Sequence, residues 1–327
     1  MGPIVVRPGP SAARPGGRVR TVRGVDALVQ VSQWPVRTVA VTVLGLDDAP
    51  AADAPAADSP AAEVWRAGPG GAVRELGRTG PDDHPFRLAS VSKLLSAYAV
   101  LIAVEEGAIG LADPAGPESS TVAHLLAHAS GLAFEGDKVL AAPGTRRIYS
   151  NAGFDRLAEA VTRATGIAFA DYLAEAVFEP LGMRRASLAG SAASGVTATL
   201  ADLRSFAAEL LAPTLLSAET FAAATSVAFP GLAGVLPGFG RQDPNDWGLG
   251  CEIRGGKNPH WTGSANAPVT FGHFGQAGTF LWVDPVAQLA CVTLCDRDFG
   301  EWAQRLWPPL SDDVLAQARP QVVNPSA

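Results

Sequence analysis

The sequence has strand-like segments toward both of its ends and a long helix-like region between them. Between residues 90 and 211, apolar side chains recur at the 3.6-residue spacing of amphipathic helices. On either side of this region, β-branched and aromatic residues alternate as they do in strands. This order favours an α+β fold, in which both termini form one antiparallel sheet flanked by helices and the middle of the chain forms an inserted, mainly α-helical lobe.

The expected helices of the middle region are residues 90–106, 121–128, 152–165, 169–178 and 199–211. The expected strands are residues 37–46, 247–254, 279–284 and 287–295, with further helical patterns at 25–34 and 299–318. We therefore expect one domain over residues 25–318. Its α/β lobe would comprise residues 25–89 and 240–318 and its helical lobe residues 90–239, with the active site in the cleft between the lobes.

Several segments are expected to lie outside this packed core. Residues 1–24 are expected to be a disordered N-terminal arm, and residues 319–327 a tail. Residues 47–62 repeat Ala, Asp and Pro, and we expect a flexible excursion that joins two adjacent strands. Residues 63–66 and 72–76 flank a Pro-Gly-Gly turn and are expected to form the two halves of the next strand pair.

Charge and composition exclude several classes of protein. The net charge of −7 is spread along 327 residues with no lysine- or arginine-rich run, so we expect no nucleic-acid partner. The longest strongly apolar stretch, residues 94–104, is shorter than the roughly 20 residues of a membrane helix, and residues 1–24 lack the apolar core of a secretory signal. We therefore expect a cytoplasmic protein that does not bind membranes, in which Cys251, Cys291 and Cys295 are buried free thiols.

Ser90 and Lys93 are the strongest catalytic candidates. They form a Ser-x-x-Lys motif at the start of an expected helix, where a spacing of three residues places both side chains on one face. A serine hydroxyl becomes a nucleophile when a neighbouring base takes its proton, and a lysine can act as that base if burial lowers its pKa. The backbone N–H of Ser90 would be one oxyanion donor. A helix cap beside a solvated lysine is the alternative.

Lysine is rare in this chain, which uses arginine almost everywhere. Lys93, Lys138 and Lys257 are its only lysines. Because arginine does not lose its proton in proteins, a lysine in such a sequence favours a position where deprotonation matters.

Tyr149 and Asn151 form a second group, which follows a turn and directly precedes an expected helix. A tyrosine beside an ammonium group can relay a proton between nucleophile and leaving group. The Asn151 amide offers both a donor and an acceptor to a substrate. A turn followed by an asparagine cap is the alternative explanation.

A third group lies in the glycine-rich segment 271–279, which contains His273, Gly275 and Gln276. Glycine within a strand marks a close approach of the backbone to another group. We expect this strand edge to lie against an extended substrate, with the Gln276 N–H facing the Ser90 N–H across a carbonyl oxygen. A structural role is the alternative for His273.

In order and character, the three groups resemble the motifs of the β-lactamase-related serine hydrolases, which include class C β-lactamases, D,D-peptidases and family VIII-type esterases. The matching residues are Ser90 and Lys93, Tyr149 and Asn151, and His273 and Gly275. The resemblance covers residues 25–318 and implies a β-lactamase/transpeptidase-like fold in which the three motifs line one cleft. Segments 124–132 and 247–250 are also similar to this family, and we assign them to the scaffold because His124 and His128 lack a third metal ligand.

The third motif departs from the Lys-Thr-Gly that β-lactamases and D,D-peptidases usually carry. His273 takes the place of the lysine, and Phe274 takes the place of the threonine. An imidazole with a pKa near 6.5 is only partly charged at neutral pH, so recognition of a substrate carboxylate should be weaker. This difference favours ester or small amide substrates over penicillins.

The sequence therefore predicts a serine hydrolase that forms an acyl-enzyme on Ser90, with Lys93 and Tyr149 exchanging the proton. A carboxylesterase or small amide hydrolase is the favoured interpretation, and we expect no metal and no cofactor. A β-lactamase or D,D-peptidase, an acyltransferase, and a non-catalytic binding or sensor protein remain alternatives. The chain contains no Gly-x-Ser-x-Gly elbow and no dinucleotide-binding or Walker loop.

Overall fold

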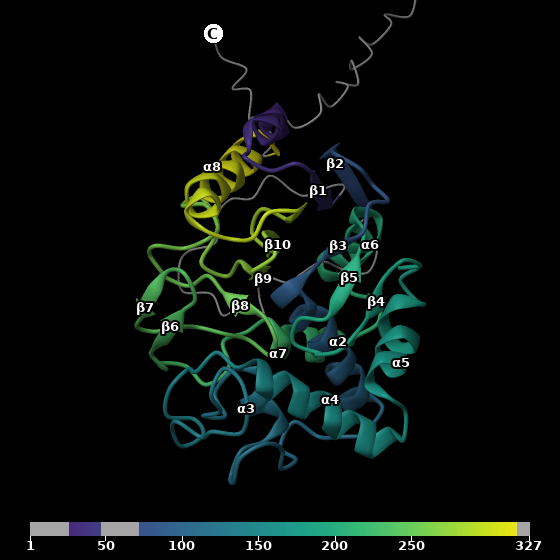
Figure 1. Ribbon diagram of the computed structural model, residues 1–327, viewed down its shortest axis with the longest axis vertical. Coiled ribbons are helices and arrows are strands. Elements are labelled where there is room, and N and C mark those ends of the chain that lie inside the picture. The colour runs from purple at the N-terminus through teal and green to yellow at the C-terminus, as the bar shows by residue number, and fades with distance from the viewer. Residues whose placement is uncertain (1–25, 47–71, 319–327) are drawn as a thin grey trace, which may run out of the picture.

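The computed structural model describes residues 26–46 and 72–318. These residues form a sheet with helices on both faces and a further group of helices below it (Figure 1). The predicted arm 1–24, excursion 47–62, strand 63–66 and tail 319–327 lie outside the described residues.

The central sheet joins the two ends of the chain. Its six strands follow the order β2-β1-β11-β10-β9-β8, and each neighbouring pair is antiparallel. They are β1 (Val39–Leu46), β2 (Val73–Thr79), β8 (Glu252–Ile253), β9 (Phe271–Gly275), β10 (Thr279–Asp284) and β11 (Leu289–Cys295). β1 pairs with β11 so that Val43 lies opposite Cys291. This pairing confirms the predicted α+β fold class, in which both ends of the chain build one sheet.

The helical segments are η1 (Asp26–Gln33), η2 (Ala89–Val91), α2 (Ser92–Glu105), α3 (Val122–Leu126), α4 (Asn151–Thr165), α5 (Phe169–Leu173), η3 (Ala174–Phe178), α6 (Leu200–Leu211), α7 (Ala218–Ala224) and α8 (Glu301–Ala318). Short strands form two further sheets, one of β3 (Phe86–Arg87), β5 (Val196–Ala198) and β4 (Ser187–Leu188), and one of β6 (Gly234–Leu236) and β7 (Gly240–Gln242). The predicted helices of the middle region are therefore present. The division into lobes at residues 89/90 and 239/240 stays a prediction.

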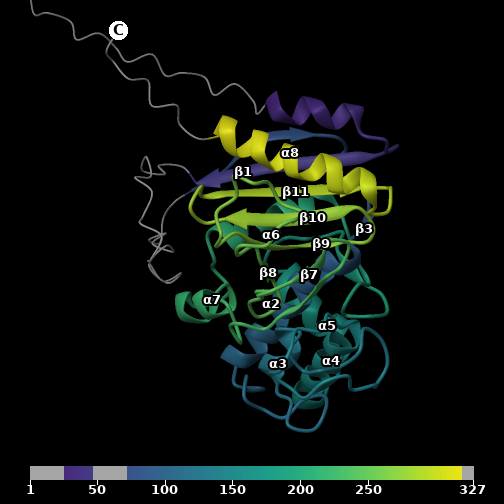
Figure 2. The ribbon, with the colours of Figure 1, turned by 90° about the vertical axis from the view of Figure 1, so that its left-hand side faces the viewer.

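Each face of the sheet has its own apolar core, because side chains alternate along a strand. Phe280 and Trp282 of β10 belong to the core on the side of α8 and η1. Leu281 and Val283 belong to the core on the opposite side, with α2 and α6. Figure 2 shows α8 crossing the near face of the strands. Burial on both faces explains why β10 and β11 are apolar runs rather than alternating ones.

Helix α2 occupies the centre of the molecule, between the sheet and the lower helices (Figure 1). It contacts α4, α5, η3 and β9, and eleven of its fourteen residues are buried. Its sequence, SKLLSAYAVLIAVE, is apolar around most of its circumference, which is typical of a helix surrounded by protein. The first turn of α2 therefore lies where the lower helices meet β9.

Several segments differ from the sequence prediction, which did not include the short strands β3 to β7. The strand predicted over residues 247–254 is wrong for its first five residues, since only Glu252–Ile253 form β8. Gly248 and Gly250 lie so close to α7 and α2 that a side chain at either position would collide with Ala224 or Ala97, and the chain turns there instead of extending. Helix α7 was not predicted, because only Phe221 and Ala224 of its seven residues are buried and the apolar pattern is short.

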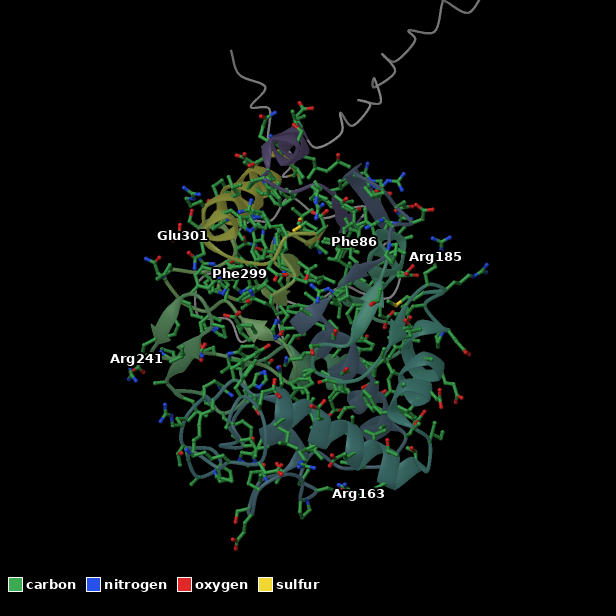
Figure 3. All side chains as sticks on the ribbon, in the orientation of Figure 1. Phe86, Arg163, Arg185, Arg241, Phe299 and Glu301 are labelled. Carbon is green, nitrogen blue, oxygen red and sulfur yellow. The ribbon has the colours of Figure 1, made fainter. Side chains whose placement is uncertain are left out.

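The described surface is mixed in charge. Arg163, Arg185 and Arg241 point outward from separate parts of the molecule (Figure 3). Each lies within ion-pair distance of an acidic neighbour, and arginine charge is therefore balanced locally at these positions. Within residues 26–46 and 72–318, no helix has the length and apolar character needed to cross a membrane. The three cysteines are free and buried, as predicted.

Candidate active site

Ser90 lies in the short turn η2 that leads into α2, as the motif predicts, and is half-buried. The backbone before it is strained: Ala89 has φ of +46°, a left-handed conformation that is uncommon for a residue with a side chain. The turn is held from both sides, since Leu88 N–H donates to Val196 O at 2.9 Å and Thr279 Oγ1 donates to Leu88 O at 2.8 Å. Neighbouring strands therefore fix the position from which the Ser90 side chain projects.

Gly275 brings β9 directly against this turn. A Cβ atom at Gly275 would collide with Leu88 O and would also crowd Thr279 Oγ1 and the Cβ atom of Ala89. Only glycine allows the strand to approach so closely. Gln276 follows at the exposed end of β9, where its carbonyl accepts a hydrogen bond from Phe299 N–H at 2.8 Å. The third predicted group thus meets the first at the end of β9.

Lys93 is fully buried one turn after Ser90. Its Nζ lies 3.3 Å from Ser90 Oγ, 2.6 Å from Asn151 Oδ1 and 3.0 Å from the carbonyl oxygen of Ala193. Burial lowers the pKa of Lys93 to about 7, against the opposing effect of the Asp155 and Glu135 carboxylates. The alternative of a solvated lysine beside a helix cap is therefore wrong for this position.

Asn151 is the first residue of α4. The preceding Ser150 caps the helix by accepting the Gly153 N–H at 3.0 Å, so the asparagine does not serve as the cap. Its Oδ1 accepts from Lys93, and its Nδ2 donates to Glu135 Oε1 at 2.8 Å. The amide oxygen thus binds an amine and the amide nitrogen binds a carboxylate, and these two bonds define the orientation of the Asn151 amide.

The Tyr149 ring lies between the first and third groups. Lys93 Nζ lies 4.7 Å from the centre of the ring, and Tyr149 Oη lies 3.4 Å from His273 Nε2. Burial raises the pKa of Tyr149, while a hydrogen bond with Ser90 opposes that rise. At neutral pH the phenol is therefore protonated and within reach of both Ser90 and His273.

The tautomer of His273 follows from its contacts. Nδ1 lies 2.6 Å from the carbonyl oxygen of Phe274, and a carbonyl only accepts, so Nδ1 carries the proton. Nε2 is then an acceptor that faces the Tyr149 hydroxyl. Burial, helped by the charge of Lys93, lowers the pKa of His273 to about 3. The expectation of a partly charged imidazole is therefore wrong: the ring is neutral at pH 7, because it is enclosed by protein.

Phe274 points away from this group of residues. Its ring packs under α8, with ring centres 4.8 Å from Phe299 and 6.1 Å from Trp307. His273 and Gly275 face the opposite side, as strand alternation requires. The face of β9 that meets Ser90 thus presents neither the cation nor the hydroxyl of a Lys-Thr-Gly motif.

Sequence reasoning missed three residues that act on Lys93. Ala193 contacts its Nζ directly, and the carboxylates of Glu135 and Asp155 act on its charge. The Ala193 contact is made by a backbone carbonyl and therefore leaves no trace in side-chain patterns. Asp155 Oδ1 holds that loop by accepting from Ser191 Oγ at 2.7 Å and from Ala192 N–H at 3.1 Å. Asp155 follows Asn151 at a spacing of four on one helix, which is the signal that could have identified it.

The two histidines assigned to the scaffold have structural contacts. His128 is buried against Tyr149 and Trp247, and its Nδ1 accepts the Ser150 N–H at 3.2 Å. His124 stacks on Phe229 with ring centres 4.4 Å apart. Among the described residues, no three His, Cys, Asp or Glu side chains are grouped so that they could hold a metal ion.

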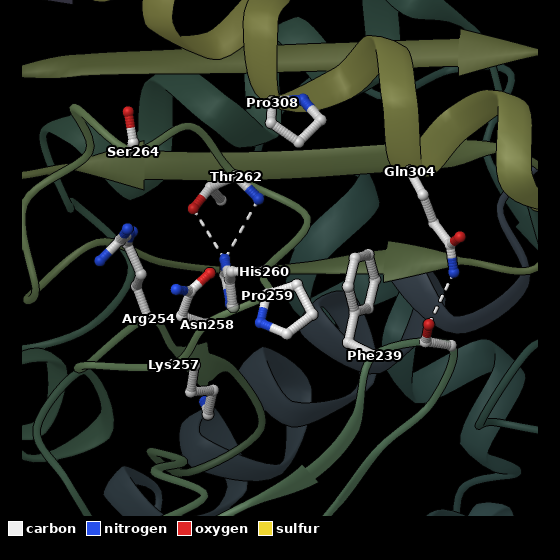
Figure 4. A pocket seen from close by; sticks show the side chains of 11 residues that line it. Phe239, Arg254, Lys257, Asn258, Pro259, His260, Thr262, Ser264, Gln304 and Pro308 are labelled. Carbon is white, nitrogen blue, oxygen red and sulfur yellow. Dashed lines mark hydrogen bonds between the residues drawn. The ribbon is translucent and has the colours of Figure 1, made fainter.

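A cavity of about 330 Å³ lies between the β6–β7 hairpin and α8 (Figure 4). Its lining includes Phe239, Arg254, Asn258, His260, Gln304 and Pro308, and none of the predicted site residues. Both ring nitrogens of His260 are engaged, with Glu252 Oε1 at 3.0 Å and Thr262 Oγ1 at 2.8 Å. The cavity is thus separate from the residues around Ser90.

A sheet built from both ends of the chain, with a serine and a buried lysine one turn apart at the start of α2, defines a β-lactamase-fold serine hydrolase. The chain belongs to the β-lactamase family, whose model matches residues 54–316.

Solved structures support this assignment. A β-lactamase from Mycobacterium bovis is 52% identical, with a TM-score of 0.80 over 90% of this chain and 99% of the other. Simvastatin synthase from Aspergillus terreus is 16% identical, with a TM-score of 0.65 over 88% of this chain and 96% of the other, in a mutant form. A β-lactamase/D-alanine carboxypeptidase from Yersinia pestis is 19% identical, with a TM-score of 0.62 over 90% of this chain and 98% of the other. The last two show a shared fold.

Among curated proteins, penicillin-binding protein 4* from Bacillus subtilis is 28% identical over 131 residues. The match spans 30% of this chain and 29% of the relative. The chain is thus similar to less than a third of the length of that protein.

Proposed function

We propose that the protein hydrolyses small carboxylic esters or amides through an acyl-enzyme on Ser90. The observation that carries this proposal is the contact of Ser90 Oγ with the fully buried Lys93, whose pKa is lowered to about 7. About half of such a lysine is neutral at pH 7, and a neutral amine can take the serine proton.

The three polar groups around Lys93 Nζ support a particular orientation of that amine. A neutral amine has two N–H bonds and one free electron pair. Asn151 Oδ1 and the Ala193 carbonyl, at 2.6 and 3.0 Å, take the two N–H bonds. The electron pair is then directed to the third neighbour, the Ser90 hydroxyl, at 3.3 Å. In this arrangement the serine donates its hydrogen to the base.

The proposed reaction begins when Ser90 Oγ bonds to the substrate carbonyl carbon and its proton moves to Lys93 Nζ. The carbonyl oxygen takes the displaced electron pair, and the N–H groups of Ser90 and Gln276 would stabilise it. The bond to the leaving group then breaks, and the proton returns from Lys93 to the leaving oxygen or nitrogen through the Tyr149 hydroxyl. Water then bonds to the acyl carbon and gives a proton to the base. The bond to Ser90 Oγ breaks, the serine takes that proton back, and the carboxylic acid is released.

Two features favour uncharged, apolar substrates. The neutral His273 offers no cation to a substrate carboxylate. Phe134 lies beside Tyr149, with ring planes 22° apart and centres 6.0 Å apart, and its side chain is 51% exposed. Val139 and Leu140, from the same loop, are exposed by 51% and 48%. An ester with an apolar acyl or alcohol group therefore suits these surroundings better than a carboxylate-bearing β-lactam does.

The names of similar proteins supply the second candidates. The Mycobacterium bovis relative is described as a β-lactamase, and the Yersinia pestis protein also as a D-alanine carboxypeptidase. Acyl transfer, in which an alcohol or amine replaces water, is a further alternative. These activities share the acyl-enzyme step. They differ in the substrate that acylates the serine or in the acceptor that removes the acyl group.

The test is a panel of p-nitrophenyl esters, penicillins and D-alanyl peptides, followed by intact-mass measurement of trapped adducts. We expect turnover of short apolar esters and an adduct that maps to Ser90. Faster turnover of penicillins than of esters would favour the β-lactamase alternative. A single burst of product without turnover would support a sensor protein, and no adduct from any substrate would refute the proposed chemistry.

The lowered pKa of Lys93 predicts the pH dependence of acylation. Only the neutral amine accepts a proton, so kcat/KM falls as the pH drops below about 7 and levels off above it. His273, with its pKa lowered to about 3, stays neutral across this range and adds no second inflection. The check is kcat/KM for one ester between about pH 5 and pH 9. A kcat/KM that still rises about tenfold per pH unit up to pH 9 would contradict the assignment of Lys93 as a base with a lowered pKa.

A further inference from the structure

We propose that Glu135 is a positioning residue for the Ser90–Lys93 pair. By accepting a hydrogen bond from Asn151 Nδ2, it holds Asn151 Oδ1 on Lys93 Nζ and so directs the electron pair of the lysine toward Ser90. This inference rests on the proposed function, because it assigns Glu135 a part in activating the proposed nucleophile.

The hydrogen bonds define a chain of four groups. Glu135 Oε1 accepts from Asn151 Nδ2 at 2.8 Å, Asn151 Oδ1 accepts from Lys93 Nζ at 2.6 Å, and Lys93 Nζ lies 3.3 Å from Ser90 Oγ. An ionised carboxylate cannot donate, so the amide must present its NH₂ group to Glu135. Its oxygen is then left for Lys93. Glu135 therefore fixes the orientation of the Asn151 amide from outside the buried site.

Without Glu135, the Asn151 amide is free to rotate by half a turn. Nδ2 would then face Lys93 and donate to its free electron pair, in competition with the Ser90 hydroxyl. A lysine engaged in this way is a poorer base for Ser90, although its position is unchanged. The expected defect is in the rate of acylation, and the folded structure should persist.

The loop that carries Glu135 is anchored to α4 and to neighbouring backbone. The Phe134 carbonyl accepts the Asn151 N–H at 2.8 Å, and Ser150 Oγ donates to the Ala133 carbonyl at 2.6 Å. Asp137, further along the same loop, forms an ion pair with Arg156 of α4. Because these contacts do not involve the Glu135 side chain, its replacement should leave the loop in place.

The charge of Glu135 also acts on Lys93. Charged and titratable groups face Lys93 from four sides. They are Tyr149 just before α4, Asp155 on α4, Glu135 on its loop, His128 after α3 and His273 on β9. Asp155 and Glu135 raise the pKa of Lys93 against the larger lowering by burial. Both histidines have lowered pKa values and carry no charge at pH 7. Removal of the Glu135 charge should thus lower the pKa of Lys93.

Glu135→Gln and Glu135→Ala separate the two effects. Glutamine keeps an oxygen that accepts from Asn151 Nδ2, so we expect the plateau of kcat/KM to stay within about twofold of the wild type. The midpoint of its pH profile should move down by about half a pH unit, because a nearby negative charge is lost. Alanine removes the acceptor as well, and its plateau should fall roughly tenfold with KM little changed.

The measurement is made on two reactions of the full-length protein. Ester hydrolysis gives kcat and KM, and phosphonylation of Ser90 by a fluorophosphonate, followed by intact mass, reports activation of the serine even if no ester is turned over. Failure of the proposed function would appear as absent ester turnover in the wild type, whereas Glu135 can still be tested by phosphonylation. Asp137→Asn is the matched control: it removes a carboxylate and one anchor of the same loop, the ion pair with Arg156, without touching Asn151. We expect its rates in both reactions to stay near those of the wild type, which would show that a loosened loop alone does not slow acylation.

Two results would overturn the inference. One is an alanine variant with wild-type rates in both reactions. The other is a glutamine variant that is as slow as the alanine variant with an unmoved midpoint, which would mean that the residue only supports the loop. Melting temperatures of all three variants close to that of the wild type would exclude unfolding as the cause of a lower rate.

Discussion

Lys93→Met should lower kcat/KM for ester hydrolysis by about 10³-fold, which is within the range expected for loss of a general base. Methionine fills the buried space that the lysine stem occupies but has no nitrogen to accept the Ser90 proton. Lys93 is fully buried, and the cost of burying an amine is removed by the same change. We therefore expect the free energy of unfolding to stay constant or rise while activity is lost.

The controls distinguish loss of the base from loss of a positive charge. Lys93→Arg retains a cation that does not deprotonate and should be as inactive as the methionine variant, while Lys138→Met, at an exposed lysine, should behave as the wild type. Ser90→Ala gives the background rate. Measurable turnover by Lys93→Met above a few per cent of the wild-type rate would show that another group removes the serine proton.

Glu252→Ala should destabilise the fold by about 3 to 5 kcal/mol, the usual effect of removing one partner of a buried ion pair. Glu252 accepts from Lys257 Nζ at 2.9 Å, His260 Nε2 at 3.0 Å and Trp261 Nε1 at 2.6 Å. Lys257 and Glu252 side chains are each 1% exposed. The substitution would leave the Lys257 ammonium buried without its counter-ion, and urea unfolding measures the loss.

A double variant tests this explanation. Glu252→Ala combined with Lys257→Met removes both charges, so it should recover much of the stability that the single variant loses. A double variant as unstable as the sum of the two single variants would show that the cost comes from packing and not from the uncompensated charge. Asp312→Ala, at a partly exposed carboxylate that bonds Ser264, provides a comparison outside the buried pair.

Much of the candidate site could be predicted because its motifs are local. Ser90 and Lys93 share one helical turn, and their contact at 3.3 Å follows from that spacing. The contacts of Asn151 with Lys93 and of His273 with Tyr149 depend on the tertiary fold. They could be expected from the sequence only because its motifs resemble those of a known family. Catalytic and binding roles for these residues stay predictions until variants are measured.

The features of the site that could not be predicted from the sequence depend on burial and on tertiary contacts. The charge of His273 depends on how completely protein surrounds it, and no local pattern reports that. The contribution of Ala193 is a backbone carbonyl, and that of Glu135 reaches Ser90 only through two intervening side chains. The turn at residues 247–251 likewise follows from close packing against α7 and α2, which lie far away in the sequence. Such features follow from the assembled fold.

The pairing of β1 with β11 has a consequence for synthesis of the protein. Val43 meets Cys291, so about 250 residues must be translated between the two strands, which takes roughly 10 to 50 s at ordinary ribosomal rates. During that time β1 has emerged without the neighbour that covers one of its edges. Helix α2, which carries Lys93, likewise contacts β9 only after β9 has been synthesised. The helices of the middle region can therefore form well before β9 brings Gly275 and Gln276 to the turn that carries Ser90.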